Sequence, residues 1–242
     1  MKARALYEKG ELHEAIRVLG EELRDDPTDR RGRTFLFELL CFAGEFERAE
    51  KQLDVLARGS QEAEMGALLY RAALHAGRQR EEKFAEEDFP RTGEGPPPVS
   101  GTLNGEEFAS LEDADPRIGA RLEVFVAGQY TWLPLEHVAS VQIEAPSRLR
   151  DLLWSPAHVE PGPELEGLEL GDVLVPVLSP LTSRSAEEAV KLGRVTDWAE
   201  TSDDLPYPVG QKLFLVDDEP VPLLEIRELK IRGPVSAARP DA

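Results

Sequence analysis

The sequence predicts an α+β protein with a short N-terminal tetratricopeptide-like helical repeat domain and a β-rich C-terminal domain. Three observations support this fold class. Apolar residues recur at helical spacing over residues 1–90, a segment rich in Pro and Gly occupies residues 91–100, and short β-type runs follow from residue 101. A chain of 242 residues is long enough to build two such domains.

The helical part contains a repeat with a period of 34 residues. The motif GELHEAI begins at Gly10, and the similar motif GEFERAE begins at Gly44. A helix, a turn and a second helix recurring at this period is typical of tetratricopeptide repeats. We expect a third such helix over residues 61–76, ended by Gly77 and followed by a shorter charged helix. The repeat is degenerate, because the Trp expected early in each unit is absent.

Residues 91–100, RTGEGPPPVS, are predicted to be a linker between the two domains. Three consecutive prolines stay extended and cannot enter a helix, so the linker should act as a semi-rigid spacer. The last ten residues, 233–242, offer little apolar surface to bury, and we expect a flexible tail there. The β-rich domain is therefore predicted to span residues 101–232.

The β-rich domain is predicted to consist of mixed short strands. The run VFVAGQYTWLP alternates around Gly128-Gln129, which predicts a β-hairpin with its turn at this dipeptide. A strand with prolines is placed at a sheet edge, because Pro cannot donate to the ladder. The expected strands after the hairpin cover residues 137–143, 170–178, 211–216 and, at the edge, 221–231, with short helical segments ending at Leu153 and over 185–191.

Several spaced motifs identify the chain as similar to a known family. The order is NGxxF, DxDxR, GxxLE and GQYxWxP, followed by LRDL with Trp154, by LGRVTDW and by VGQKLFLV. This set closely resembles the ImpE/TagJ family of accessory proteins of bacterial type VI secretion systems. The matching positions include Asp113, Asp115, Arg117, Tyr130, Trp132, Pro134, Trp154 and Trp198.

The resemblance implies a cytoplasmic, non-enzymatic adaptor. Members of this family are thought to bind a helical segment of the small subunit of the contractile sheath and to influence how the sheath is handled. The residues themselves support a weaker statement, namely a protein-binding module, because helical repeats present extended surfaces suited to a partner helix. A structural stabiliser or a homodimer is a further possibility that the sequence leaves open.

The repeat also predicts a partner-binding surface. In tetratricopeptide arrays the first helix of each repeat lines the concave face. Within this surface, Phe42 would offer an apolar anchor, and Arg31 and Arg71 could bind carboxylates in bidentate fashion. The predicted partner-binding residues are Arg31, Thr34, Glu38, Phe42, Glu64, Arg71 and His75.

Charge and composition argue against other classes of partner. The formal net charge is −19, and such a field repels nucleic acid and anionic lipid surfaces. The sequence contains no run of about 18 apolar residues and begins without a signal peptide, so we expect a cytoplasmic protein without membrane insertion. The single cysteine, Cys41, lies in an apolar run and is predicted to be buried.

No motif in the sequence supports catalysis, and we expect no cofactor and no metal site. The four histidines lack the spacing of metal ligands. The alternative is a cytoplasmic hydrolase or transferase that uses Asp113, Asp115 and His137. We favour a structural role for the two aspartates, a capped turn with Arg117 as the ion partner. The three tryptophans are expected in the core of the C-terminal domain.

Overall fold

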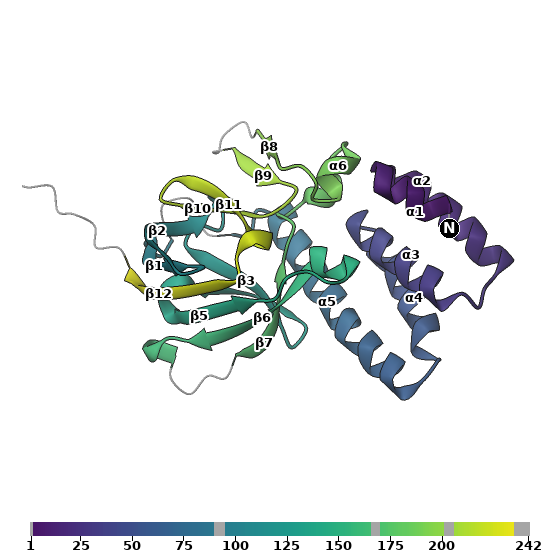
Figure 1. Ribbon diagram of the computed structural model, residues 1–242, viewed down its shortest axis with the longest axis horizontal. Helices are drawn as coiled ribbons and strands as arrows, with labels where there is room; N and C mark the ends of the chain where they lie inside the picture. Colours follow the sequence, from purple (N-terminus) through teal and green to yellow (C-terminus); the bar gives the residue numbers. More distant parts are fainter. Residues whose placement is uncertain (1, 90–94, 166–169, 201–205, 235–242) are drawn as a thin grey trace, which may run out of the picture.

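In the computed structural model, which describes residues 2–89, 95–165, 170–200 and 206–234, five helices lead into a large curled antiparallel sheet (Figure 1). The helices occupy one end of the molecule and the sheet the other. The predicted architecture of mixed short strands is corrected here, because ten strands join into one antiparallel sheet. The helices are α1 (Lys2–Lys9), α2 (Leu12–Asp25), α3 (Arg30–Phe42), α4 (Phe46–Ala57) and α5 (Gln61–Ala85).

The first four helices form two hairpins with the predicted 34-residue period. Gly10 and Gly44 lie in the two turns with φ of +89° and +72°, a backbone conformation that glycine adopts without steric cost. Ala15 and Ala49, the small residues of the two motifs, are both fully buried. Their size allows the paired helices to approach closely, as the repeat motif predicts.

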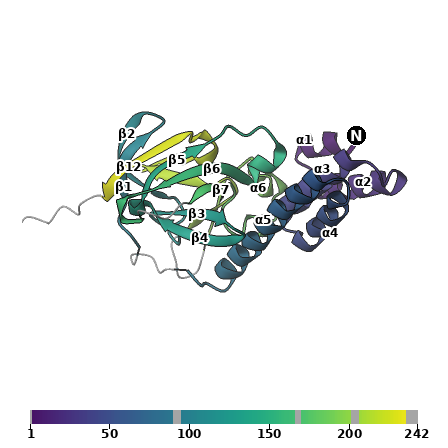
Figure 2. The same cartoon turned by 90° about the horizontal axis from the view of Figure 1, so that it is seen from below.

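The third repeat differs from the prediction, because α5 is a single helix of 25 residues. Gly77 does not end the helix but lies buried inside it. Only about 1 kcal/mol separates Gly from Ala in a helix interior, so tertiary packing easily outweighs this preference. The helix extends from the hairpins to the sheet and lies along both (Figure 2).

The sheet has the strand order β11-β10-β2-β1-β12-β5-β6-β7-β3-β4, and β8 and β9 form a separate two-stranded ribbon. The predicted edge strand over 221–231 is wrong. This run contains the end of β11, which does lie at an edge, and the start of β12, which lies centrally between β1 and β5. The large sheet comprises β1 (Val99–Leu103), β2 (Glu106–Asp113), β3 (Arg121–Val126), β4 (Gln129–Pro134), β5 (Val138–Ile143), β6 (Trp154–Pro161), β7 (Gly171–Pro176), β10 (Leu213–Val216), β11 (Glu219–Pro222) and β12 (Glu228–Pro234).

The predicted hairpin is present as β3 and β4, with Val126 paired to Gln129. Its turn residues are Ala127 and Gly128, one position earlier than predicted. Both have positive φ, +48° and +78°, as the tight turn of a two-residue hairpin requires. The short ribbon consists of β8 (Asp197–Ala199) and β9 (Tyr207–Val209), and the short helix α6 covers Glu188–Lys191.

Two apolar cores lie at the two ends of the molecule. One fills the interior of the curled sheet, and the other lies among the helices. The helical core also includes sheet-side residues, namely Phe125, Leu153, Trp154 and Leu192, so the helices pack onto the sheet. The predicted linker and tail fall partly outside the described residues, and the domain division remains a prediction.

None of the described helices combines the length and the apolar character that crossing a lipid bilayer requires.

Candidate functional site

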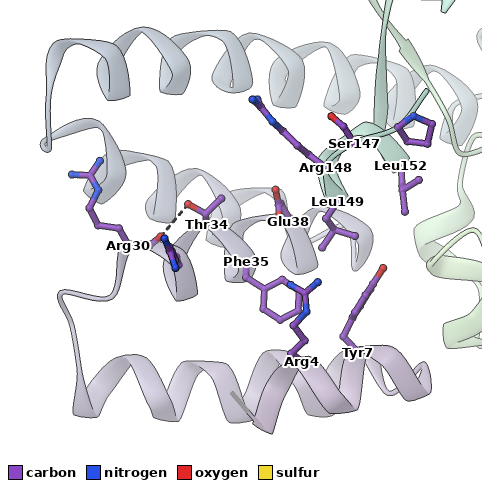
Figure 3. Close-up of a pocket in the computed structure, with 12 residues that line it drawn as sticks. Arg4, Tyr7, Arg30, Thr34, Phe35, Glu38, Ser147, Arg148, Leu149 and Leu152 are labelled. Carbon is purple, nitrogen blue, oxygen red and sulfur yellow. Dashed lines mark hydrogen bonds between the residues drawn. The ribbon is translucent and has the colours of Figure 1, made fainter. Parts of the chain in front are cut away.

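A groove of about 690 Å³ opens between the helical part and residues 146–152. Its lining residues come from α1, from α3 and from the 3-10 helix η2 (Leu149–Leu152) with the residues before it. Figure 3 shows Arg4 and Tyr7 on one side and Leu149 on the other, with Phe35 between them. Because η2 connects two strands of the sheet, the groove needs both parts of the molecule in place.

Two carboxylates bind backbone N–H groups of the segments that line the groove. Asp29 caps α3 by accepting a hydrogen bond from the Gly32 backbone N–H at 2.9 Å, which sets where this helix begins. Asp151 accepts hydrogen bonds from the backbone N–H groups of Ser147 and Arg148, at 2.9 and 2.8 Å. The turn that leads into η2 is thereby held in one conformation.

The groove is cationic although the chain is strongly acidic. Four arginines and one carboxylate line it, namely Arg4, Arg30, Arg31, Arg148 and Glu38. The backbone carbonyl of Leu56 accepts a hydrogen bond from Arg30, at 3.2 Å. Burial raises the pKa of Glu38 to about 7, although the Arg150 guanidinium at 3.8 Å opposes this shift. The groove can therefore attract carboxylates.

Three predicted partner-binding residues line this groove, Arg31, Thr34 and Glu38. Phe42 does not. Its side chain is 1 % exposed and belongs to the helical core, so its prediction as an accessible anchor is wrong. At the end of α3, the apolar face packs inward against the neighbouring helices. Apolar residues at helical spacing do not show whether a helix face lies in the core or lines a groove.

The other three predicted partner-binding residues lie on α5 and do not line the groove. Glu64 and His75 are exposed. Arg71 forms an ion pair with Asp54 of α4 at 2.7 Å. The structure thus divides the predicted set between two surfaces.

The prediction missed the residues that complete the groove. Arg4 and Tyr7 belong to α1, the first helix of the first repeat, so the concave-face rule could have found them. The residues from 146–152 come from the other half of the chain, and no pattern in the sequence indicates that they approach α3. The missed lining residues are Arg4, Tyr7, Arg30, Phe35, Pro146, Ser147, Arg148, Leu149 and Leu152.

A buried cluster of charges joins α5 to the sheet. Arg80 of α5 donates two hydrogen bonds to the Glu123 carboxylate of β3, both at 2.7 Å. Lys212 lies 2.7 Å from Glu123 and also pairs with Asp113. Burial would raise the pKa of Glu123, but Arg80 and Lys212 hold it well below its usual range. Removal of one partner from such a cluster strongly destabilises a protein.

The residues of the enzymatic alternative do not form an open site. Asp113 and Asp115 are 3 % and 0 % exposed. The backbone N–H of Asp115 donates to Asp113, and Arg117 binds the Asp115 carboxylate at 2.6 and 2.8 Å, so the expected capped turn with its ion pair is present. His137 instead pairs with Glu164 at 2.9 Å. Among the described residues, no hydrogen bond or ion pair joins His137 to either aspartate.

The tryptophans have three different environments, which corrects the expectation of a shared C-terminal core. Trp132 is half-buried on β4, where its indole N–H donates to the Tyr130 hydroxyl. Trp154 packs in the helical core beside Phe37 and Tyr70. Trp198, on the β8–β9 ribbon, is 47 % exposed.

Helical hairpins docked on a curled antiparallel sheet, with a cationic groove at the junction, define an α+β protein. The chain belongs to the ImpE family. Residues 105–230 match the family model described as ImpE protein, and this region contains the aspartate turn and the β3–β4 hairpin.

Two known proteins are similar to almost the whole chain. The type VI secretion system accessory component TagJ of Pseudomonas aeruginosa (strain PAO1) is 32 % identical, with 95 % of this chain and 90 % of TagJ covered. A crystal structure of protein VPA1032 from Vibrio parahaemolyticus shares the fold, with a TM-score of 0.82 and 22 % identity over 96 % of this chain and 97 % of that chain.

Proposed function

We propose that this protein is a non-enzymatic accessory protein of a type VI secretion system that works in the cytoplasm as an adaptor. In this proposal it binds a helical segment of the small subunit of the contractile sheath and so modulates how the sheath is handled. Family membership and the similarity to TagJ support the accessory role. The buried and ion-paired state of Asp113 and Asp115 supports binding over catalysis.

The observation that carries the binding part of the proposal is the groove between α1, α3 and η2. A cleft walled by two helices and by a segment that contributes Leu149 and Leu152 has a shape that suits an amphipathic helix. Arg31, Thr34 and Glu38, which the repeat alignment places on the concave face, line it. We therefore assign the partner helix to this groove and not to the exposed face of α5.

The experiment is a binding measurement with purified sheath small subunit from the same organism. We expect Arg31→Glu to weaken binding by about tenfold or more, because charge reversal at an interface replaces attraction with repulsion. Lys51→Glu is the matched control, since Lys51 is an exposed cation of α4 outside the groove. Calorimetry gives the affinities, and circular dichroism checks that each variant is folded.

Two results would contradict this assignment. Failure of the unmodified protein to bind the small subunit would remove the sheath as the partner. If Arg71→Glu abolished binding while Arg31→Glu did not, the site would lie on α5 instead.

A further inference from the structure

The charge of the groove contrasts with the charge of the whole molecule. The chain carries a formal net charge of −19, yet four of the five charged residues that line the groove are arginines. Arg31 and Arg148 are exposed, and within the described ranges neither has a carboxylate at ion-pair distance. Arg4 pairs with Glu8 at 3.6 Å, but both side chains are about two-thirds exposed, so this pair is weak. These guanidinium groups remain free to bind a ligand.

Apolar side chains occupy the space between the arginines. Phe35 is 7 % exposed and contacts Tyr7 edge to face, with 5.7 Å between the ring centroids. Leu149 and Leu152 are half-buried on the opposite wall. Figure 3 shows this arrangement, with Arg148 above and Arg4 below the apolar side chains. A ligand that fits must therefore have an apolar face bordered by negative charge.

We propose that the groove selects an acidic amphipathic helix, whose apolar face packs on Tyr7, Leu149 and Leu152 and whose carboxylates bind Arg31 and Arg148. This inference deepens the proposed function and rests on it, because it specifies the chemistry of the partner helix. Arginine suits this role, since its planar guanidinium binds a carboxylate through two parallel hydrogen bonds. The net charge of −19 repels long polyanions such as nucleic acid, so a short acidic segment of a protein is the partner that fits.

The groove forms only where residues 146–152 pack against the helices, so selection of the partner requires both parts of the chain. Arg148, Leu149 and Leu152 come from the sheet part, whereas Arg31 and Tyr7 come from the helices. Both the charge and the apolar surface that select the partner are thus shared between two parts of the chain. Substitutions on either wall should have the same effect on binding.

The test uses the full chain and two synthetic helices of about 20 residues. Both peptides carry the same Leu and Ala residues on one face, and the other face carries Glu in one peptide and Lys in the other. We expect the Glu peptide to bind and the Lys peptide to bind at least tenfold more weakly, although the net charge of −19 would favour the Lys peptide by itself. Fluorescence anisotropy at two salt concentrations measures both affinities, and the Glu peptide should bind more weakly at high salt.

Variants on both walls locate the binding site. We expect Arg31→Glu and Arg148→Glu each to weaken binding of the Glu peptide about tenfold, while Lys51→Glu leaves it unchanged. Arg148→Ala, which removes the charge without reversing it, gives a second measurement should Arg148→Glu fail to fold. Equal or stronger binding of the Lys peptide, no binding of either peptide, or insensitivity to both reversals would overturn the proposal.

These outcomes separate the inference from the proposed function. If the sheath small subunit binds but the acidic peptide does not, the inference fails and the proposed function stands. If the acidic peptide binds in the groove but the small subunit does not, the charge selection stands and the sheath assignment fails.

Discussion

Glu38 is a carboxyl group in a buried position on α3, where burial disfavours its ionised form. Its side chain is 10 % exposed, and burial raises its pKa from 4.5 to about 7. The folded state therefore binds this proton more tightly than the unfolded chain does. As a consequence, the free energy of unfolding falls as pH rises from about 4.5 to 7. Above that range Glu38 is ionised in both states and causes no further change with pH.

We expect Glu38→Gln to remove this pH dependence. The variant should be more stable than the parent by about 1–3 kcal/mol at pH 8 and similar to it near pH 4.5. Urea denaturation at both pH values measures the difference. Glu82→Gln, at an exposed glutamate of α5, is the control and should show no such gain. Equal stability of Glu38→Gln and parent at pH 8 would show that Glu38 ionises without cost.

Some contacts of single residues could be predicted from the sequence, and others could not. The motif with Asp113, Asp115 and Arg117 predicted a turn with an internal ion pair, because short-range chemistry determines both. The partners of Glu123 could not be predicted. Arg80 lies 43 residues before Glu123 and Lys212 lies 89 residues after it, and charged residues of these types are usually exposed.

At the scale of elements, the helices and the hairpin followed the sequence pattern, since both depend on local periodicity and turn residues. Two elements did not. The continuous α5 is stabilised by the sheet on which it lies, and a central position for β12 depends on pairing with β1 and β5. Such contacts join distant segments, and the pattern within one segment does not specify them.

A substitution at Gly77 tests whether α5 is continuous at this position. A Cβ atom added there would lie 4.0 Å from the Phe125 ring, an ordinary van der Waals contact. We expect Gly77→Ala to raise the free energy of unfolding by about 0.5–1 kcal/mol, because Ala is the better helix former. Gly66→Ala, with nothing within 4 Å, should give a similar gain. A loss of stability in Gly77→Ala alone would indicate a helix break at this position.

At the scale of the whole molecule, three features join the helices to the sheet. They are the buried pairing of Arg80 with Glu123, the packing of Trp154 among the helices, and the groove whose walls come from both parts. The sequence predicted a helical part and a β-rich part in the right order. It did not predict their shared surface, which is where the candidate site lies.

Hydrogen–deuterium exchange with mass spectrometry tests the central claim, that a partner helix binds in the shared groove. The full chain is measured with and without purified sheath small subunit. We predict that added subunit slows exchange in α1, in α3 and in residues 146–152, and that Arg31→Glu removes this protection. Slower exchange over residues 61–75 of α5, with the three groove segments unchanged, would contradict the account.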